Sequence, residues 1–167
     1  PVLQQYFDNM KIIRNMNGIV EWPYPENGSK EHYSKILKPK IDAGQSMVWT
    51  IFEKNKENHP IGRIEFRLKK QKEDHSHRGF WLAEPYWNRG YMTEAVNILN
   101  DFIFEKLRFK KIVLTNLSNN IASHRIKEKT GATYLKTFQD DWRNEKRNFE
   151  IWELKAENWR KFREQQQ

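Results

Sequence analysis

The chain has 167 residues, 37% of them hydrophobic, with a formal net charge of +8 and no cysteine. This length and hydrophobic content predict a single domain, residues 1–167, with its own core. The lack of cysteine excludes a disulfide framework, a thiolate metal site and a cysteine nucleophile, and is typical of a reducing cytoplasm. No apolar run approaches membrane-spanning length and the five histidines form no metal-ligand cluster, so we predict a cytoplasmic protein without a metal or a membrane contact.

The hydrophobic pattern predicts helices and strands that follow one another along the chain. In chain order these are helices at 2–19 and 30–38, separated by a Pro/Gly/Asn-rich loop at 22–29, strands at 47–53, 61–68 and 75–82, a helix from Thr93, a strand at 111–116, a helix after Asn120, and two strands within 133–154 around a turn at 143–146. This order predicts an α/β fold with a mixed, mostly antiparallel twisted sheet flanked by helices.

The segment from Gly79 to Val96, GFWLAEPYWNRGYMTEAV, has the pattern of a strand, a short turn and the start of a helix. A helix start leaves backbone N–H groups without partners, and the helix dipole adds positive charge there, so such a turn suits a phosphate or pyrophosphate. Gly90 lets the backbone approach an anion closely, and Arg89 adds a full positive charge. The segment therefore predicts a phosphorylated ligand.

Three segments resemble the GNAT acetyltransferases, in particular the RimJ/RimL type that acetylates ribosomal proteins. WLAEPYWNRGYMTEA resembles the acetyl-CoA pyrophosphate loop of that type, and NIASHRIKEKTGA, which begins at Asn120, resembles N-x-A-S-x-x-x-x-E-K-x-G-F. FEIWEL, with Trp159 beyond it, resembles the closing strand of the family and its terminal Trp. Family members usually begin with a strand before the first helix, so we expect this chain to lack that first strand.

The resemblance implies acetyl-CoA as cosubstrate and assigns the residues that bind it. The pyrophosphate loop comprises Arg89, Gly90, Tyr91, Met92 and Thr93. In the second motif, Asn120 is expected to cap a helix and to position the pantetheine arm, with Ser123 beside it. Arg125 and Lys129, further along the same predicted helix, are candidates for the CoA 3′-phosphate.

Acetyl transfer from a thioester to an amine needs a proton for the departing thiolate, and two residues are candidates for this acid. The family often uses a Tyr four residues before the Gly that ends the helix, and that position is Lys127 here. Members of the RimJ/RimL type can instead use the Ser of N-x-A-S, which is Ser123. We therefore assign the acid to Ser123, while a local hydrogen bond to the backbone remains its alternative role.

The same reaction needs a neutral amine, and the base that provides it is left open between two residues. Many family members place a Glu two residues before the Gly that Gly79 represents, and the matching residue is His77. An imidazole titrates near neutral pH and can accept that proton. Glu65, on the neighbouring predicted strand, is the alternative carboxylate, and a solvent relay needs no single base.

The resulting prediction is an acetyl-CoA-dependent N-acetyltransferase that acts on a protein N-terminus of the ribosomal-protein kind, as a monomer or homodimer. A small-molecule amine, such as a polyamine or an aminoglycoside, remains open as the acceptor. The rival class is a non-catalytic basic module that binds RNA or a ribosomal surface, because a basic chain attracts anionic partners. The aromatic residues of this chain lie mostly among apolar residues and do not form the exposed stacking platforms of RNA-binding proteins. We therefore do not predict nucleic acid as a specific ligand.

Overall fold

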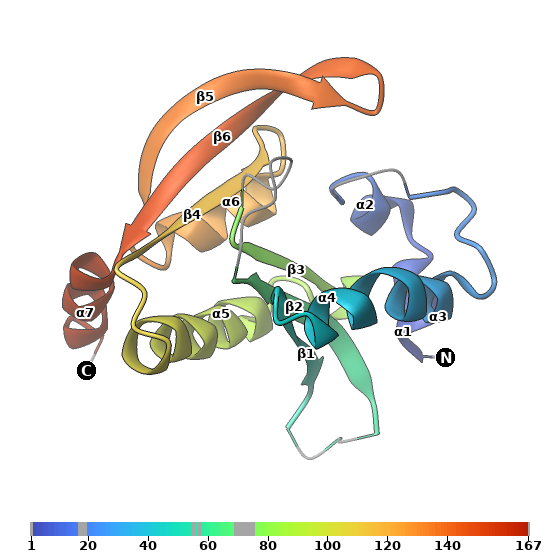
Figure 1. Cartoon of the computed structure of the whole chain (residues 1–167), viewed down its shortest axis with the longest axis horizontal. Coiled ribbons are helices and arrows are strands. Elements are labelled where there is room, and N and C mark those ends of the chain that lie inside the picture. Colours follow the sequence, from blue (N-terminus) through green and yellow to red (C-terminus); the bar gives the residue numbers. More distant parts are fainter. Residues whose placement is uncertain (1, 17–19, 55, 57, 69–75, 167) are drawn as a thin grey trace. The chain divides into compact units, whose positions relative to one another are not determined.

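The structure is a computed structural model that describes residues 2–16, 20–54, 56, 58–68 and 76–166. Two compact units divide the chain: Pro1–Lys70 with Arg78–Arg89, and Gln71–His77 with Gly90–Gln167. Each unit contains one three-stranded antiparallel sheet together with helices (Figure 1). The predicted α/β class with antiparallel sheets flanked by helices is confirmed.

The first unit begins with short helices. They are α1 Val2–Phe7, α2 Met10–Ile13, α3 Gly28–His32, the π-helix η1 Tyr33–Leu37 and α4 Lys38–Asp42. The predicted helix over 2–19 is interrupted because the extended residue Asn9 caps α2, its side chain accepting from the backbone N–H of Lys11 at 2.9 Å; residues 17–19 lie outside the described part. The predicted helix over 30–38 is longer than expected, since α3, η1 and α4 follow one another without a break.

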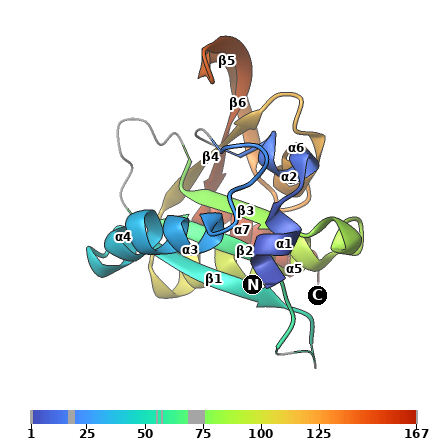
Figure 2. The same ribbon diagram turned by 90° about the vertical axis from the view of Figure 1, so that its right-hand side faces the viewer.

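The sheet of the first unit has the order β1-β2-β3, with β1 Ser46–Phe52, β2 Pro60–Arg67 and β3 Arg78–Leu82. The central strand β2 is buried on both faces, where Ile61, Ile64 and Phe66 are at most 4% exposed. Helix α1 packs on β2 and α4 packs on β1 (Figure 2). The third strand begins at Arg78 rather than at 75, and residue 75 lies outside the described residues.

The 3-10 helix η2 Glu84–Tyr86 leads to α5 Tyr91–Asp101, which continues as the π-helix η3 Phe102–Lys106. The boundary between the two units falls between Arg89 and Gly90. Val96, Leu99 and Ile103 are buried at near-helical spacing, as the sequence predicts. The fourth residue of the predicted stripe, Leu107, is only partly buried because it follows the end of the helix.

The sheet of the second unit has the order β4-β6-β5, with β4 Lys111–Leu117, β5 Thr133–Trp142 and β6 Glu145–Lys155. Strands β5 and β6 form a long curved hairpin, and α6 Ile121–Glu128 lies beside β4 and β6 (Figure 1). The turn predicted at 143–146 is shorter than expected: only Arg143 and Asn144 lie between the strands, both with positive φ, 51° and 66°, as a two-residue hairpin turn requires.

The sequence did not predict the last helix, α7 Ala156–Glu164. Its Trp159 is 1% exposed and packs on Phe104. The Trp159 indole N–H donates to Asp101 Oδ1 at 2.9 Å, and Arg163 pairs with Oδ2 of the same residue at 3.1 Å. Helix α7 is therefore anchored to the end of α5. Within the described residues, none of the helices has the length and apolar character that a membrane span requires.

Candidate active site

Helix α5 begins with an open N-terminus. Its N-cap residue, Gly90, has a left-handed backbone with φ 86°, and among the described residues no side chain caps this helix start. A Cβ built on Gly90 would meet no atom within 4 Å, so the left-handed backbone rather than crowding favours glycine. First-turn N–H groups and the helix dipole at such a start attract anions.

The residues of the first turn differ in what they can offer an anion. The side chain of Met92 is buried in the core at 8% exposure, so only its backbone can contact a ligand. Tyr91 and Thr93 are partly exposed. The roles of these three residues and of Gly90 in binding acetyl-CoA stay predictions.

Arg89 belongs to the first unit, where it already has partners. Its guanidinium lies 3.8 Å from Glu53 Oε1 and 5.7 Å from the ring centre of Tyr86. The Arg89 side chain is 53% exposed, so the ion pair is loose and screened by solvent. Its predicted contact with pyrophosphate would compete with Glu53 and also stays a prediction.

Helix α6, in contrast, begins with a capped N-terminus. Asn120 Oδ1 accepts from the backbone N–H of Ser123 at 3.2 Å, and the Asn120 N–H donates to the carbonyl of Leu117 at 2.8 Å. The N-cap predicted for Asn120 is confirmed. This cap fixes the backbone of Ser123, which is 8% exposed.

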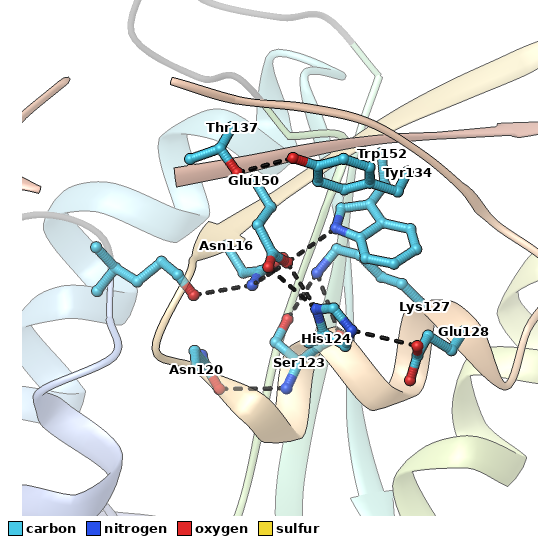
Figure 3. Close-up of polar contacts among 11 residues, drawn as sticks. Asn116, Asn120, Ser123, His124, Lys127, Glu128, Tyr134, Thr137, Glu150 and Trp152 are labelled. Carbon is cyan, nitrogen blue, oxygen red and sulfur yellow. Dashed lines mark hydrogen bonds and ion pairs between the residues drawn. The ribbon is translucent and has the colours of Figure 1, made fainter. Parts of the chain in front are cut away.

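Ser123 has a charged partner one helical turn further on. Lys127 Nζ donates to Ser123 Oγ at 2.8 Å and lies 3.3 Å from the Ser123 carbonyl oxygen (Figure 3). Lys127 is only 2% exposed, which is rare for a lysine. Ser123, the predicted acid, is therefore in direct contact with Lys127, the residue at the position where the family often has a Tyr acid.

A buried carboxylate, Glu150 of β6, lies opposite Asn116 of β4. Its Oε2 accepts from Asn116 Nδ2 and from the indole N–H of Trp152, both at 3.0 Å, and His124 Nδ1 lies at the same distance (Figure 3). Burial alone would raise the pKa of Glu150, but the hydrogen bonds from Trp152, Asn116 and His124 together lower it below its ordinary value. The carboxylate is thus ionised at neutral pH.

His124 lies between two carboxylates. Its Nδ1 faces Glu150, its Nε2 is 3.3 Å from Glu128 Oε1, and its ring meets Trp152 edge-on at 5.0 Å. The hydrogen bond to Glu150 raises the pKa of His124, against a weaker opposing effect of burial. Despite these acids, no group of three or more His, Asp or Glu residues in the described part of the chain could hold a metal ion.

The sequence analysis did not place Glu150, His124 or Asn116 in the site. One signal was present: Glu150 shares a strand face with Trp152 and Leu154, where a carboxylate needs partners. A second was Asn116, which shares a face of β4 with the buried Leu114.

The first predicted base, His77, lies in the second unit against β4. The backbone N–H of Val113 points at its Nδ1 at 3.1 Å, and the Val113 carbonyl oxygen is 3.3 Å from the same nitrogen. The tautomer protonated on Nε2 accepts from the Val113 N–H, whereas the tautomer protonated on Nδ1 donates to the Val113 carbonyl oxygen; a base needs the second tautomer, in which Nε2 carries the lone pair. The role of His77 as base stays a prediction and depends on that second tautomer.

The second predicted base, Glu65 of β2, lies in the first unit. Its carboxylate accepts from Ser46 Oγ at 3.0 Å and pairs with Arg67 at 3.3 Å. Glu65 is 8% exposed, so these partners satisfy the hydrogen-bonding needs of a buried carboxyl group. Its catalytic role also stays a prediction.

Arg125 and Lys129 both lie on the exposed face of α6, four residues apart. Side chains at this spacing are neighbours on a helix surface, so two cations share one patch. Their predicted contact with the 3′-phosphate of CoA stays a prediction.

A separate hollow of about 440 Å³ lies elsewhere in the second unit. Its lining has an aromatic part and a cationic rim and includes Phe104, Arg108, Phe109, Lys110, Lys155 and Arg160. Glu105 pairs with two of these cations, Arg108 and Arg160. No predicted site residue lines this hollow.

Comparison with known proteins identifies the family. The model of the acetyltransferase (GNAT) domain matches residues 1–133, and the chain belongs to this family. The chain is therefore an acetyltransferase, and acetyl-CoA is its acetyl donor. The predicted family and cosubstrate are confirmed. Among curated proteins, no sequence matches this chain.

Solved structures of similar fold include three acetyltransferases whose names state what they act on or protect against. RimL, the ribosomal L7/L12 α-N-protein acetyltransferase in complex with CoA, is 16% identical, with a TM-score of 0.74 over 93% of this chain and 87% of that one. The ribosomal-protein-S5-alanine acetyltransferase of Vibrio fischeri is 16% identical, with a TM-score of 0.73 over 95% and 88%. The microcin C7 self-immunity acetyltransferase MccE, in complex with acetyl-CoA and AMP, is 20% identical, with a TM-score of 0.71 over 92% and 85%. At these identities the likeness establishes the fold.

Proposed function

We propose that this chain moves the acetyl group of acetyl-CoA directly to the N-terminal amine of a protein, within a ternary complex in the cytoplasm. The observation that carries this proposal is the buried Ser123, whose backbone N–H is held by the Asn120 cap and whose hydroxyl is held by Lys127. The absence of cysteine supports direct transfer, because an acetyl-cysteine intermediate is impossible. Two structures of similar fold carry names of ribosomal-protein acetyltransferases, which supports a protein acceptor.

In this proposal the two helix starts have separate tasks. The open start of α5, from Gly90 to Thr93, binds the pyrophosphate through backbone N–H groups, with Arg89 as an added charge. The capped start of α6 presents Ser123, whose hydroxyl gives a proton to the departing thiolate. His77, Glu65 or a solvent relay takes the proton of the amine.

The second candidate acceptor is a small molecule. The similarity of this fold to that of MccE supports it, because the name of that enzyme connects it with microcin C7 and not with a ribosomal protein. A polyamine or an aminoglycoside would then replace the protein N-terminus. The cofactor chemistry of Ser123 would be the same for both acceptors, because both present a primary amine.

The experiment that tests the proposal is an assay of CoA release by the purified protein. Acetyl-CoA is combined with N-terminal peptides of ribosomal proteins, with polyamines or with aminoglycosides, and the freed thiol is measured; the chain contributes no thiol background because it has no cysteine. We expect the N-terminal peptides to give the highest kcat/KM. Faster turnover of a polyamine or an aminoglycoside would transfer the proposal to a small-molecule acceptor.

Salt tests whether the basic chain also binds nucleic acid. RNA held by several Lys or Arg contacts to phosphate loses orders of magnitude in affinity over a few-fold rise in salt. We expect acetyl-CoA binding that weakens only modestly with salt, and RNA binding that is weak and independent of sequence. Tight, sequence-specific RNA binding would contradict the prediction that nucleic acid is not a specific ligand of this acetyltransferase.

A further inference from the structure

We propose that Lys127 enables Ser123 to act as the acid. The Lys127 ammonium orients the Ser123 hydroxyl and stabilises Ser123 Oγ after the hydroxyl proton has left. This inference rests on the proposed function, in which Ser123 is the acid, and it assigns to Lys127 a positioning role at that site. Figure 3 shows Lys127 and Ser123 side by side on successive turns of α6.

The hydrogen bond between the two side chains has a defined direction. A lysine ammonium has three N–H donors and no acceptor, whereas a serine hydroxyl has one O–H donor and two lone pairs. At 2.8 Å, Ser123 Oγ must therefore accept from Lys127 Nζ. The hydroxyl proton of Ser123 is then left to point at a different acceptor, as an acid requires.

Burial strengthens the effect of the Lys127 ammonium on the Ser123 hydroxyl. Lys127 and Ser123 are 2% and 8% exposed, and the attraction between an ammonium and a developing alkoxide is larger where water is excluded. The Asn120 cap holds the Ser123 backbone at the same time, so both the position and the charge environment of the hydroxyl are fixed.

The proton transfers balance. As the C–S bond of the thioester breaks, the Ser123 O–H bond breaks and its proton forms the S–H bond of free CoA. A proton of the Lys127 ammonium then moves to Ser123 Oγ, and Lys127 regains a proton from solvent. The acceptor amine releases one proton to solvent or to the base when its N–C bond forms, so no proton is gained or lost overall.

The decisive test replaces Ser123 by cysteine and measures the pKa of that thiol. The chain has no other cysteine, so the pH dependence of iodoacetamide alkylation reports this thiol alone. A neighbouring cation lowers a thiol pKa, and it is the thiolate that reacts. We expect Ser123→Cys to be alkylated at pH 7 about tenfold faster than Ser123→Cys/Lys127→Met, which corresponds to about one pKa unit.

The control variants are Ser123→Cys/Lys127→Arg, which keeps the charge, and Ser123→Cys/Lys127→Gln, which removes it but keeps a hydrogen-bonding group. The Arg variant should resemble Ser123→Cys and the Gln variant should resemble the Met variant; the Gln variant also replaces the Met variant if that one does not fold. Equal thiol pKa values with lysine and with the neutral residues would overturn the inference.

The second test follows turnover. Lys127→Met should lower kcat about tenfold while the Kd of acetyl-CoA stays within about twofold, because the ammonium acts on the leaving group rather than on the bound cosubstrate. Ser123→Ala/Lys127→Met should be no slower than Ser123→Ala, since Lys127 acts through Ser123; additive losses would overturn the inference. A wild-type chain without acetyl transfer would defeat the proposed function, whereas the thiol titration would still decide the role of Lys127.

Discussion

Two helices of the second unit, α5 and α6, begin in opposite ways. Helix α5 follows a left-handed Gly90 and, among the described residues, has no capping side chain, whereas the first turn of α6 is capped by Asn120. Capping by Asn120 uses the N–H of Ser123, the group that an anion would otherwise bind.

A helix start can therefore serve one of two purposes: it can bind a ligand through its backbone N–H groups, or it can position side chains for chemistry. The start of α5 offers N–H groups and the positive end of a dipole, which suit a pyrophosphate. The start of α6 offers Ser123 and His124, whose side chains are fixed by Lys127 and Glu150. Substitutions at each start should therefore affect different steps of the reaction.

The largest effect is expected from Gly90→Asp at the start of α5. A carboxylate placed about 4 Å from a phosphate costs about 4 kcal/mol at an effective dielectric constant of about 20, so acetyl-CoA should no longer raise the melting temperature. Gly90→Asn is the matched control, because asparagine has the same size and also tolerates a left-handed backbone. Equal thermal shifts for the Asp and Asn variants would contradict an anion site at α5.

The second prediction concerns the chemistry at α6. Ser123→Ala should lower kcat about 100-fold, within the range that a positioned acid contributes, while the Kd of acetyl-CoA stays nearly unchanged. Isothermal titration and single-turnover kinetics separate the two quantities. Full turnover of the alanine variant would remove Ser123 from the mechanism.

The third prediction tests the cap itself. Asn120→Ala should lower the stability by about 1 kcal/mol, or the melting temperature by about 3 °C, and should also lower kcat because the Ser123 backbone is no longer fixed. Asn9→Ala is the control, since Asn9 is also an N-cap, of α2 in the first unit, where it accepts from the N–H of Lys11 and donates to Glu84. If both variants leave kcat unchanged, the Asn120 cap serves stability alone.

The fourth prediction uses the raised pKa of His124. A histidine whose pKa is higher in the folded than in the unfolded state stabilises the fold fully below its unfolded value of about 6.5, and this contribution disappears as the pH rises through the folded pKa. The melting temperature of the wild type should therefore fall relative to that of His124→Gln as the pH rises above 6.5. A difference in melting temperature between the two proteins that stays constant over this pH range would show that Glu150 does not raise the pKa of His124.

The smallest effect is expected from the exposed cations of α6. Arg125→Ala/Lys129→Ala should weaken CoA binding about threefold, the scale of an exposed ion pair, and should leave the binding of 3′-dephospho-CoA unchanged. Fluorescence titration with the two ligands measures the difference. The same loss for both ligands would place these cations away from the 3′-phosphate.

Much of the fold could be predicted from local sequence. Strands β1 and β2 and the stripe of Val96, Leu99 and Ile103 were predicted from residue spacing alone. Helix α7 was missed because Trp159 and Phe162 are nearly its only large apolar residues among charged ones. Its stability comes from partners such as Asp101, 58 residues earlier, which no local pattern contains.

The candidate site divides in the same way. The Asn120 cap was predicted from local sequence, because Asn120 and Ser123 are only three positions apart. The contacts of Glu150 with Asn116 and His124 join residues 34 and 26 positions apart. They depend on the register between β4 and β6, which local periodicity does not determine.

The order in which the chain is synthesised has a consequence for α6. Two partners come later: Trp152 meets the ring of His124 on α6, and Phe162 lies 3.2 Å from the position that a Cβ would occupy on Gly131, just beyond the end of α6. A ribosome adds residues from the N-terminus onward, and contacts can form only after both members have been made. Nascent chains that end before Phe162 therefore contain every residue of the N-x-A-S motif but lack contacts that hold its helix in place.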